Sequence, residues 1–190
     1  MVGWRDSERK RLLAQRQAIE PEERARRDAR LISNLDALLR RQPRTQRIIS
    51  AYWPMRGEPD LRCWLKTRHQ RGDPCALPVL VAMDAPLAFR QWSPGGRMIA
   101  GAWDTQIPAD DLPVVPTVVI MPVVAFDRDC YRLGYGGGYF DRTLASMSPK
   151  PLCIGVGYAQ FGLVSIEPHS LDVPMSFVVT EQGIIEPHRP

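Results

Sequence analysis

A glycine-rich segment at residues 132–142 carries the residue types that bind phosphate. It reads Arg-Leu-Gly-Tyr-Gly-Gly-Gly-Tyr-Phe-Asp-Arg. Glycines let backbone N–H groups approach phosphate oxygens without Cβ clashes, and a helix that begins near Tyr139 would add unpaired N–H donors and a positive dipole end. Arg132 and Arg142 supply guanidinium groups, which form paired hydrogen bonds to phosphate. The segment therefore predicts an active centre that binds the phosphates of a nucleotide.

Asp141 lies near the end of the same segment. A carboxylate is a hard oxygen ligand of the kind that Mg²⁺ takes beside a bound triphosphate, so we expect Asp141 to hold this metal. The alternative interpretation is a tight glycine turn with a solvated salt bridge. The segment is neither a Walker A motif, because no Gly-Lys-Ser/Thr follows the glycines, nor a clean G-x-G-x-x-G fingerprint.

Helical patterns flank a series of short apolar runs. Residues 7–41 are expected to be helical, with a restart at Pro21, because proline is favoured at the first position of a helix. Further along, a helix capped by Asp60 and a helix over residues 139–147 are expected. The leucines of the first region recur at helical spacing, which predicts a face packed on the core.

The apolar runs rich in β-forming residues predict strands. They occupy residues 48–53, 76–81, 87–92, 117–126, 152–156 and 177–180. The run at 117–126 is the most apolar, and its Pro122 must lie near a strand end because proline cannot donate to the ladder. Residues 93–116, rich in Gly, Pro and Asp, are expected to be long connections. The alternation predicts an α/β fold, a three-layer α/β/α sandwich with a mostly parallel sheet.

Length and composition indicate one globular domain. The chain has 190 residues, of which 44% are hydrophobic and 24% charged, as is ordinary for a globular protein. We expect a single domain over residues 1–190, with residues 1–45 as an N-terminal helical arm packed on the α/β core. No apolar run approaches the roughly 20 residues of a membrane span, and the charged N-terminus lacks the apolar core of a signal peptide. The expected location is the cytoplasm.

Cysteine spacing and charge bound the possible partners. Four cysteines and three histidines lack the spacing of a zinc site, so reduced, mostly buried thiols are expected. The net charge is +4, and residues 1–47 hold 13 Lys or Arg against seven Asp or Glu. This basic arm lacks the interleaved aromatic residues of a nucleic-acid surface. We therefore expect no nucleic-acid partner, no membrane partner, and a monomer or weak dimer.

The glycine-rich segment also resembles the signature of a known family. Together with Met-Pro-Val-Val-Ala-Phe-Asp at residues 121–127, it is similar to the motif of the 5-formyltetrahydrofolate cyclo-ligases (methenyltetrahydrofolate synthetases), with Phe140 in place of a second tyrosine. Residues 52–60, 154–160 and 172–181 resemble three further segments of that family, so the resemblance covers nearly the whole chain. The family has a three-layer α/β sandwich fold, in agreement with the elements above.

The resemblance implies an ATP-dependent ligase of folate and one-carbon metabolism. ATP would phosphorylate the formyl oxygen of 5-formyltetrahydrofolate, and N10 would then attack the activated carbon. Release of ADP and phosphate would leave 5,10-methenyltetrahydrofolate. Phosphorylation turns a poor leaving group into a good one, and phosphoryl transfer depends mainly on positioning and charge neutralisation. The implied partners are these small molecules, with Mg²⁺ as the cofactor.

The resemblance also implies roles for individual residues. Contacts with the ATP phosphates are implied for Arg5, Arg9, Arg132, Leu133, Gly134, Tyr135, Gly136, Gly137, Gly138, Tyr139 and Phe140. Contacts with the folate are implied for Trp53, Glu58, Tyr135, Gly136, Gly137, Gly138 and Tyr139. Within this set Glu58 would form a hydrogen bond to the pterin and Trp53 would line its pocket. Asp141 and Asp172 would be the ligands of Mg²⁺.

The chain departs from the family pattern at several positions. Arg5 stands where the family usually has a lysine that contacts ATP, four residues before an arginine matched by Arg9. Leu171 stands where many relatives have histidine, and Ser176 where they have aspartate. Residues 104–108 lack the usual glutamate.

These departures motivate a second hypothesis, a non-catalytic relative that binds a nucleotide or RNA on the same scaffold. A third hypothesis, a sugar-phosphate isomerase-like enzyme, would need an acid/base pair of carboxylates, which the sequence does not identify.

Overall fold

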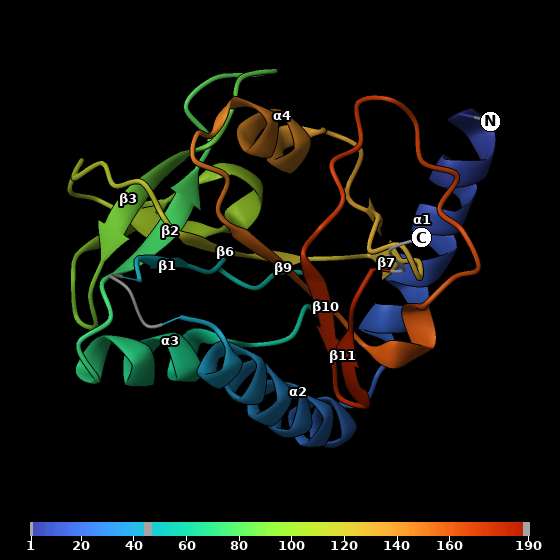
Figure 1. The fold of residues 1–190 in the computed structure, drawn as a ribbon, viewed down its shortest axis with the longest axis horizontal. Helices are drawn as coiled ribbons and strands as arrows, with labels where there is room; N and C mark the ends of the chain where they lie inside the picture. The colour runs from blue at the N-terminus through green and yellow to red at the C-terminus, as the bar shows by residue number, and fades with distance from the viewer. Residues whose placement is uncertain (1, 44–46, 188–190) are drawn as a thin grey trace.

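A mixed, mostly parallel sheet runs through the centre of the protein (Figure 1). The computed structural model describes residues 2–43 and 47–187, and in this part the main sheet has seven strands in the order β11-β10-β9-β6-β1-β2-β3. The strands are β1 (Ile49–Ser50), β2 (Cys75–Val79), β3 (Ala88–Trp92), β6 (Val118–Pro122), β9 (Leu152–Val156), β10 (Phe177–Thr180) and β11 (Gly183–Ile185). The inner strands from β10 to β2 are parallel, and the edge strands β11 and β3 pair antiparallel.

Helices cover both faces of the sheet (Figure 1). The helices are α1 (Val2–Gln17), α2 (Pro21–Arg41), α3 (Arg62–Gln70) and α4 (Tyr139–Ser146), with short 3₁₀ turns η1 (Ala102–Asp104) and η2 (Ala159–Phe161). Helices α2 and α3 pack on one face, α4 packs on the other, and α1 lies beside β7 at one end of the molecule. This arrangement confirms the predicted α/β sandwich with a mostly parallel sheet.

The expected domain boundaries fall partly outside the described residues. The single domain was expected over residues 1–190 and its helical arm over residues 1–45. Of these, residues 1, 44–46 and 188–190 lie outside the part that the structure describes.

Alternate residues of the parallel strands point to opposite faces and fill two cores. Leu35 of α2 is fully buried in a cluster with Ile120 and Ile154. On the other face, Leu144 of α4 shares a cluster with Met121. All the leucines of α2 are buried. This confirms the prediction that their helical spacing forms a face packed on the core.

A third apolar cluster attaches α1 to the rest of the protein. Leu12 of α1 packs with Ala125 and Leu133 of a small hairpin and with Tyr158 and Phe161. The hairpin consists of β7 (Ala125–Phe126) and β8 (Arg132–Leu133). This packing fixes α1 beside the glycine-rich segment, which begins at β8.

Local details differ from the sequence predictions because proline and tertiary pairing redirect the chain. Strand β6 ends at Pro122, and the apolar run continues as β7 in a separate hairpin. Residues 93–116, expected to be connections, contain a hairpin of β4 (Met98–Ala100) and β5 (Gln106–Pro108). Helix α3 begins one residue later than expected, with Leu61 at its N-cap position, although Oδ1 of Asp60 accepts a hydrogen bond from the N–H of Arg62 (3.0 Å).

The order of the strands brings two distant segments together. From β1 the chain moves outward to β2 and β3, whereas from β6 it moves outward the other way to β9 and β10. Strands β1 and β6 are parallel neighbours, so the topological switch point of the sheet lies between their carboxyl ends. Ligands of open α/β sheets bind in the crevice at such a point. Residues 51–60 after β1 and residues 123–138 after β6 are therefore the expected walls of a binding site.

The substitution Leu35→Ala is expected to lower the free energy of unfolding by about 2–5 kcal/mol, because it removes buried apolar surface and leaves a cavity. Urea denaturation measures this loss. Leu112→Ala is the control, since Leu112 is 53% exposed and its truncation should change stability by less than about 0.5 kcal/mol. Equal losses in the two variants would contradict the described packing of α2.

Candidate functional site

A cleft of about 1200 Å³ opens at the carboxyl ends of β1 and β6. Its walls come from the first half of α1, the segment after β1, the end of β2 with the loop to β3, the β4–β5 hairpin, the glycine-rich segment with the start of α4, and the loop before β10. The cleft thus lies at the switch point that the topology of the sheet defines.

The cleft collects nearly all the site residues that the sequence nominates. The fifteen that line it are Arg5, Arg9, Trp53, Glu58, Arg132, Gly134, Tyr135, Gly136, Gly137, Gly138, Tyr139, Phe140, Asp141, Arg142 and Asp172. The exception is Leu133, whose side chain is fully buried in the cluster that holds α1. Leu133 therefore supports the wall of the cleft from behind.

The glycine-rich segment lets an arginine lie directly on its backbone. Gly136 and Gly138 have φ angles of +94° and +62°, a region that residues with a Cβ rarely adopt. A Cβ at Gly136 would lie 3.4 Å from the guanidinium carbon of Arg9, and Nε of Arg9 donates to the carbonyl of Gly134 (2.6 Å). Gly138 is the N-cap residue of α4, so unpaired N–H groups of this helix follow the segment directly.

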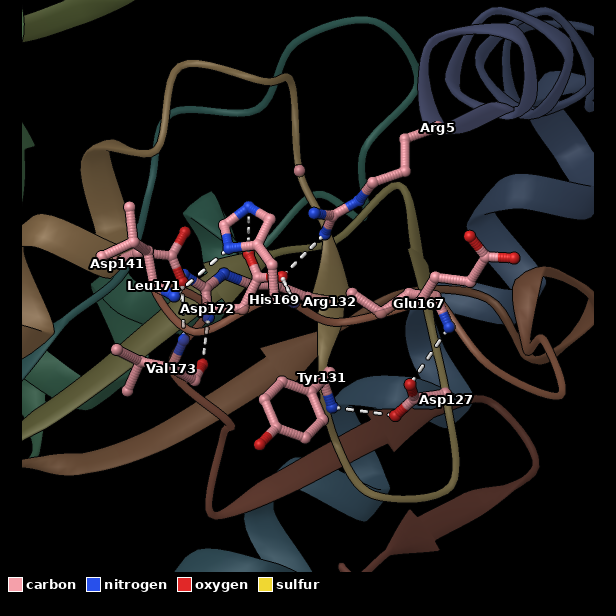
Figure 2. Close-up of polar contacts among 12 residues, drawn as sticks. Arg5, Asp127, Tyr131, Arg132, Asp141, Glu167, His169, Leu171, Asp172 and Val173 are labelled. Atoms are coloured by element: carbon pink, nitrogen blue, oxygen red, sulfur yellow. Dashed lines mark hydrogen bonds and ion pairs between the residues drawn. The ribbon is translucent and has the colours of Figure 1, made fainter. Parts of the chain in front are cut away.

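Arg132, which is buried, and Asp141, which is partly buried, form an ion pair at the cleft (Figure 2). Nη2 of Arg132 donates to Oδ1 of Asp141 (2.6 Å), and Nη1 donates to the carbonyl of Val173 (2.8 Å). The N–H of Val173 donates to the same Oδ1 (3.0 Å). Among the described residues Oδ2 of Asp141 has no hydrogen-bond partner, so this oxygen can accept a further ligand.

A second pair joins α1 to the loop before β10 (Figure 2). Nη2 of Arg5 donates to Oδ2 of Asp172 (3.0 Å), which also accepts the N–H of His169 (2.9 Å). Nε2 of His169 lies 3.6 Å from the other oxygen, Oδ1. Leu171 stands where many relatives have histidine, but His169, a residue not predicted from the sequence, places an imidazole beside the carboxylate of Asp172. The spacing of His169 three residues before Asp172 was the available signal.

Glu58 is buried where the two segments of the switch point meet. Its Oε1 accepts a hydrogen bond from the hydroxyl of Tyr135 (2.6 Å), and its Oε2 accepts one from the N–H of Met55 (2.9 Å). Burial raises the pKa of Glu58, an effect that the Tyr135 hydrogen bond and the charge of Arg16 oppose. Burial and the adjacent Glu58 carboxylate raise the pKa of Tyr135. The phenol therefore stays protonated and donates a hydrogen bond to Glu58.

Two tryptophans add aromatic surface to the cleft. Trp53 follows β1 and lies beside the guanidinium of Arg62, whose Cζ is 5.4 Å from the ring centroid. Trp103, which is 49% exposed, lies 5.5 Å from the ring of Tyr139. Trp103 could not be recognised from the sequence, because nothing in its Gly- and Pro-rich stretch shows that a hairpin carries it to the cleft. Its φ of +56° is a strained conformation of a kind that clusters at binding sites.

The fold and the cleft define an α/β protein of the class that binds ligands at the switch point of a parallel sheet. The model of the 5-formyltetrahydrofolate cyclo-ligase family matches residues 2–181. The chain belongs to this family, which confirms the assignment that the motifs at residues 121–142 predict.

Individual relatives agree with the family. The chain is 30% identical to the 5-formyltetrahydrofolate cyclo-ligase of Mycolicibacterium smegmatis over 150 residues, which cover 73% of this chain and 76% of that protein. It is 28% identical to the Escherichia coli protein of the same name over 145 residues, which cover 73% and 80%. The solved structure of Aquifex aeolicus 5,10-methenyltetrahydrofolate synthetase is similar with a TM-score of 0.83 and 27% identity, covering 98% of this chain and 94% of that one.

Asp127 forms hydrogen bonds to two loops, the turn before Arg132 and the loop that leads to Asp172 (Figure 2). Its side chain is buried, and Oδ1 accepts the N–H groups of Asp129 (3.1 Å) and Tyr131 (3.0 Å). Its Oδ2 accepts the N–H of Ile166 (3.1 Å), in the loop that leads to Asp172. One carboxylate therefore shapes the turn before Arg132 and holds the loop that contains Asp172.

The substitution Asp127→Ala is expected to lower the free energy of unfolding by about 2–4 kcal/mol, because it leaves one buried and two partly buried N–H groups without acceptors. Asp129→Ala is the matched control in the same turn, since Asp129 is exposed, and it should change stability by less than about 0.5 kcal/mol. Urea denaturation of both variants measures the difference. A loss no larger for Asp127→Ala than for the control would show that the carboxylate does not organise these loops.

Proposed function

We propose that the chain is a 5-formyltetrahydrofolate cyclo-ligase, which converts 5-formyltetrahydrofolate and ATP to 5,10-methenyltetrahydrofolate, ADP and phosphate. The observation that carries this proposal is that the family's signature segment lines one large cleft together with Glu58 and Asp172. The non-catalytic alternative is not favoured, because the curated relatives are named as the ligase.

On this proposal the ATP phosphates bind against the glycine-rich segment. The guanidinium groups of Arg5, Arg9 and Arg132 line this part of the cleft. They supply positive charge. The backbone from Gly134 to Phe140 lets the phosphate oxygens approach closely and supplies N–H groups as hydrogen-bond donors. Positioning and charge neutralisation are the main requirements of phosphoryl transfer. The replacement of the family's lysine by Arg5 keeps the charge but offers a planar fork in place of a compact ammonium.

The folate is proposed to bind beside Glu58, between aromatic side chains. Each carboxylate oxygen of Glu58 has one protein hydrogen bond and can accept another, so the ionised group can receive two N–H donors of a pterin. Trp53, Trp103 and Tyr139 line the same cleft and provide surfaces for a flat ring. Tyr135 borders both proposed binding regions.

The chemistry follows from holding the two substrates in one cleft. The formyl oxygen attacks the γ-phosphorus, and the bond to ADP breaks. The N10 nitrogen then attacks the formyl carbon and loses its proton, and the formyl oxygen departs as phosphate. The residues of the cleft bind and orient the reactants and neutralise the charge on the phosphates.

We propose that Asp141 and Asp172 hold Mg²⁺, which would neutralise charge on the triphosphate. Mg²⁺ is usually bound through one or two carboxylates together with substrate phosphates and waters, so the donor set fits this ion. It requires no larger cage, and the described residues contain no cluster of three or more potential metal ligands. The oxygen Oδ2 of Asp141, which has no partner in the described part of the chain, is the proposed donor on that side.

We further propose that residues 1–45 act as the arm of a single domain, because α1 brings Arg5 and Arg9 to the cleft.

The proposed location is the cytoplasm. This is supported by the cysteines, which are free thiols, as cytoplasmic proteins usually have; they are Cys63, Cys75, Cys130 and Cys153. We propose a monomer or weak dimer. Within the described residues, no helix combines the length and apolar character needed to cross a membrane.

Incubation of the protein with 5-formyltetrahydrofolate, ATP and Mg²⁺ is expected to produce the methenyl product, followed by its absorbance. Product formation should require both substrates and should stop when the metal is chelated. Tight, salt-dependent RNA binding without any product would instead support the non-catalytic alternative.

The substitution Asp141→Asn is expected to lower kcat/KM for Mg·ATP by about 100-fold or more, because a neutral amide is a poor Mg²⁺ ligand and a charge contact is lost. The magnesium concentration for half-maximal rate should rise as well. Asp111→Asn is the control, because Asp111 is 78% exposed and pairs with Arg90, away from the cleft. Circular dichroism verifies that both variants fold, and a wild-type rate for Asp141→Asn would exclude this residue from the metal site.

A further inference from the structure

Arg16 is a buried charged residue that lies behind the wall of the cleft. It is in the last turn of α1, is 1% exposed, and is not among the described residues that line the cleft. We propose that Arg16 is a positioning residue for the folate, which acts through Tyr135 to keep the carboxylate of Glu58 ionised and correctly placed. This inference rests on the proposed role of Glu58 in binding the folate.

The guanidinium of Arg16 is fixed at three points. Nε donates to the carbonyl of Arg56 (3.0 Å), and Nη1 donates to the carbonyl of Val123 (3.1 Å). Nη2 donates to the hydroxyl of Tyr135. These partners belong to the segments that follow β1 and β6, so the arginine connects both sides of the switch point to α1.

The hydrogen bond from Arg16 sets the direction of the Tyr135 hydroxyl. A guanidinium can only donate, and a phenol has a single hydrogen. Because Tyr135 accepts from Arg16, its own hydrogen is available for Oε1 of Glu58, at 2.6 Å. Nη2 of Arg16 also lies 3.9 Å from that oxygen, which makes a direct ion pair between side chains that are 2% and 1% exposed.

Charges around Glu58 show why Arg16 matters for its ionisation. Burial raises the pKa of Glu58, and the opposing influences are the Tyr135 hydrogen bond, the charge of Arg16, the N–H of Met55 and the charge of Arg56. Burial and the charge of Glu58 raise the pKa of Tyr52, whose hydroxyl donates to the carbonyl of Pro59 (2.7 Å). Arg16 is the larger of the two charge contributions, so its removal favours the neutral acid. A neutral acid has lost one of the acceptor sites that two pterin N–H groups would need.

The test compares Arg16→Gln, which removes the charge, with Arg16→Lys, which keeps it. At pH 7, Arg16→Gln should raise the KM for 5-formyltetrahydrofolate about tenfold, the size expected for a lost charge-assisted hydrogen bond, and should change kcat less. KM rises as the pH falls through the pKa of Glu58, so the variant should show this rise at higher pH than the wild type. Arg16→Lys should restore the wild-type pH profile.

Arg68→Gln is the matched control for a merely structural effect. Arg68 is 14% exposed in α3, forms an ion pair with Asp73, and does not line the cleft. It should lower stability without changing the folate KM or its pH profile. Identical kinetic changes in Arg16→Gln and Arg68→Gln would overturn the proposal, as would a lysine variant that behaves like the glutamine variant.

A ligand-free measurement separates this inference from the proposed function. Carbon-13 NMR of the Glu58 carboxyl gives its pKa in the wild type, Arg16→Gln and Arg16→Lys, with Glu58→Gln to assign the signal. We expect a higher pKa in Arg16→Gln than in Arg16→Lys, even for a protein that makes no methenyl product. An unchanged titration in Arg16→Gln would refute the inference while leaving the ligase activity intact. If Arg16→Gln does not fold, the wild type is compared with Tyr135→Phe instead. This variant lacks the hydroxyl that lies between Arg16 and Glu58, so it should also raise the pKa of Glu58.

Discussion

The parallel pairing of β1 with β6 is the constraint on which the site depends. It aligns Ile49 with Val118 and Ser50 with Val119, and it is stabilised by apolar side chains that are buried on both faces of the sheet. Since the two strands end side by side, the segments that follow them must meet. Glu58 and Tyr135, which are 77 positions apart, form a hydrogen bond for this reason.

Charge compensation is the second organising feature of the cleft. An anion-binding site needs several arginines close together, and their mutual repulsion would be costly without counter-charges. Arg5 pairs with Asp172 and Arg132 pairs with Asp141, while the deeper Arg16 pairs with Glu58. On the proposed function, the first two carboxylates are also metal ligands. Binding of Mg·ATP would then exchange partners, with the metal taking the carboxylates and the phosphates taking the arginines.

Some of this architecture could be predicted because it depends on local sequence. The leucine spacing of α2, the break at Pro122 and the glycine-rich segment all arise from residues near one another in the chain. Residues whose position depends on distant pairing could not be found in this way. Trp103 reaches the cleft on a hairpin within a stretch that has no clear strand pattern, and Arg16 is one of many arginines in a basic arm.

The sequence by itself determined the α/β class, the family and the segment that is proposed to bind phosphate, because period, glycine content and motif are local properties. Tertiary structure alone decided which charges became partners. The family motif points to Arg5 and Arg9 in α1 but gives no role to Arg16, which is buried behind the cleft that the first two line. The physical reason is that packing of Leu12 against the β7–β8 hairpin fixes the rotation of the helix. Arg5, Arg9 and Arg16 share one face of this helix, because four residues turn it by about 40° and eleven residues by about 20° beyond whole turns, so this rotation aims all three at the site. Their position along the helix then separates them: Arg5 and Arg9 line the cleft from its first half, whereas Arg16, in the last turn, lies against Glu58.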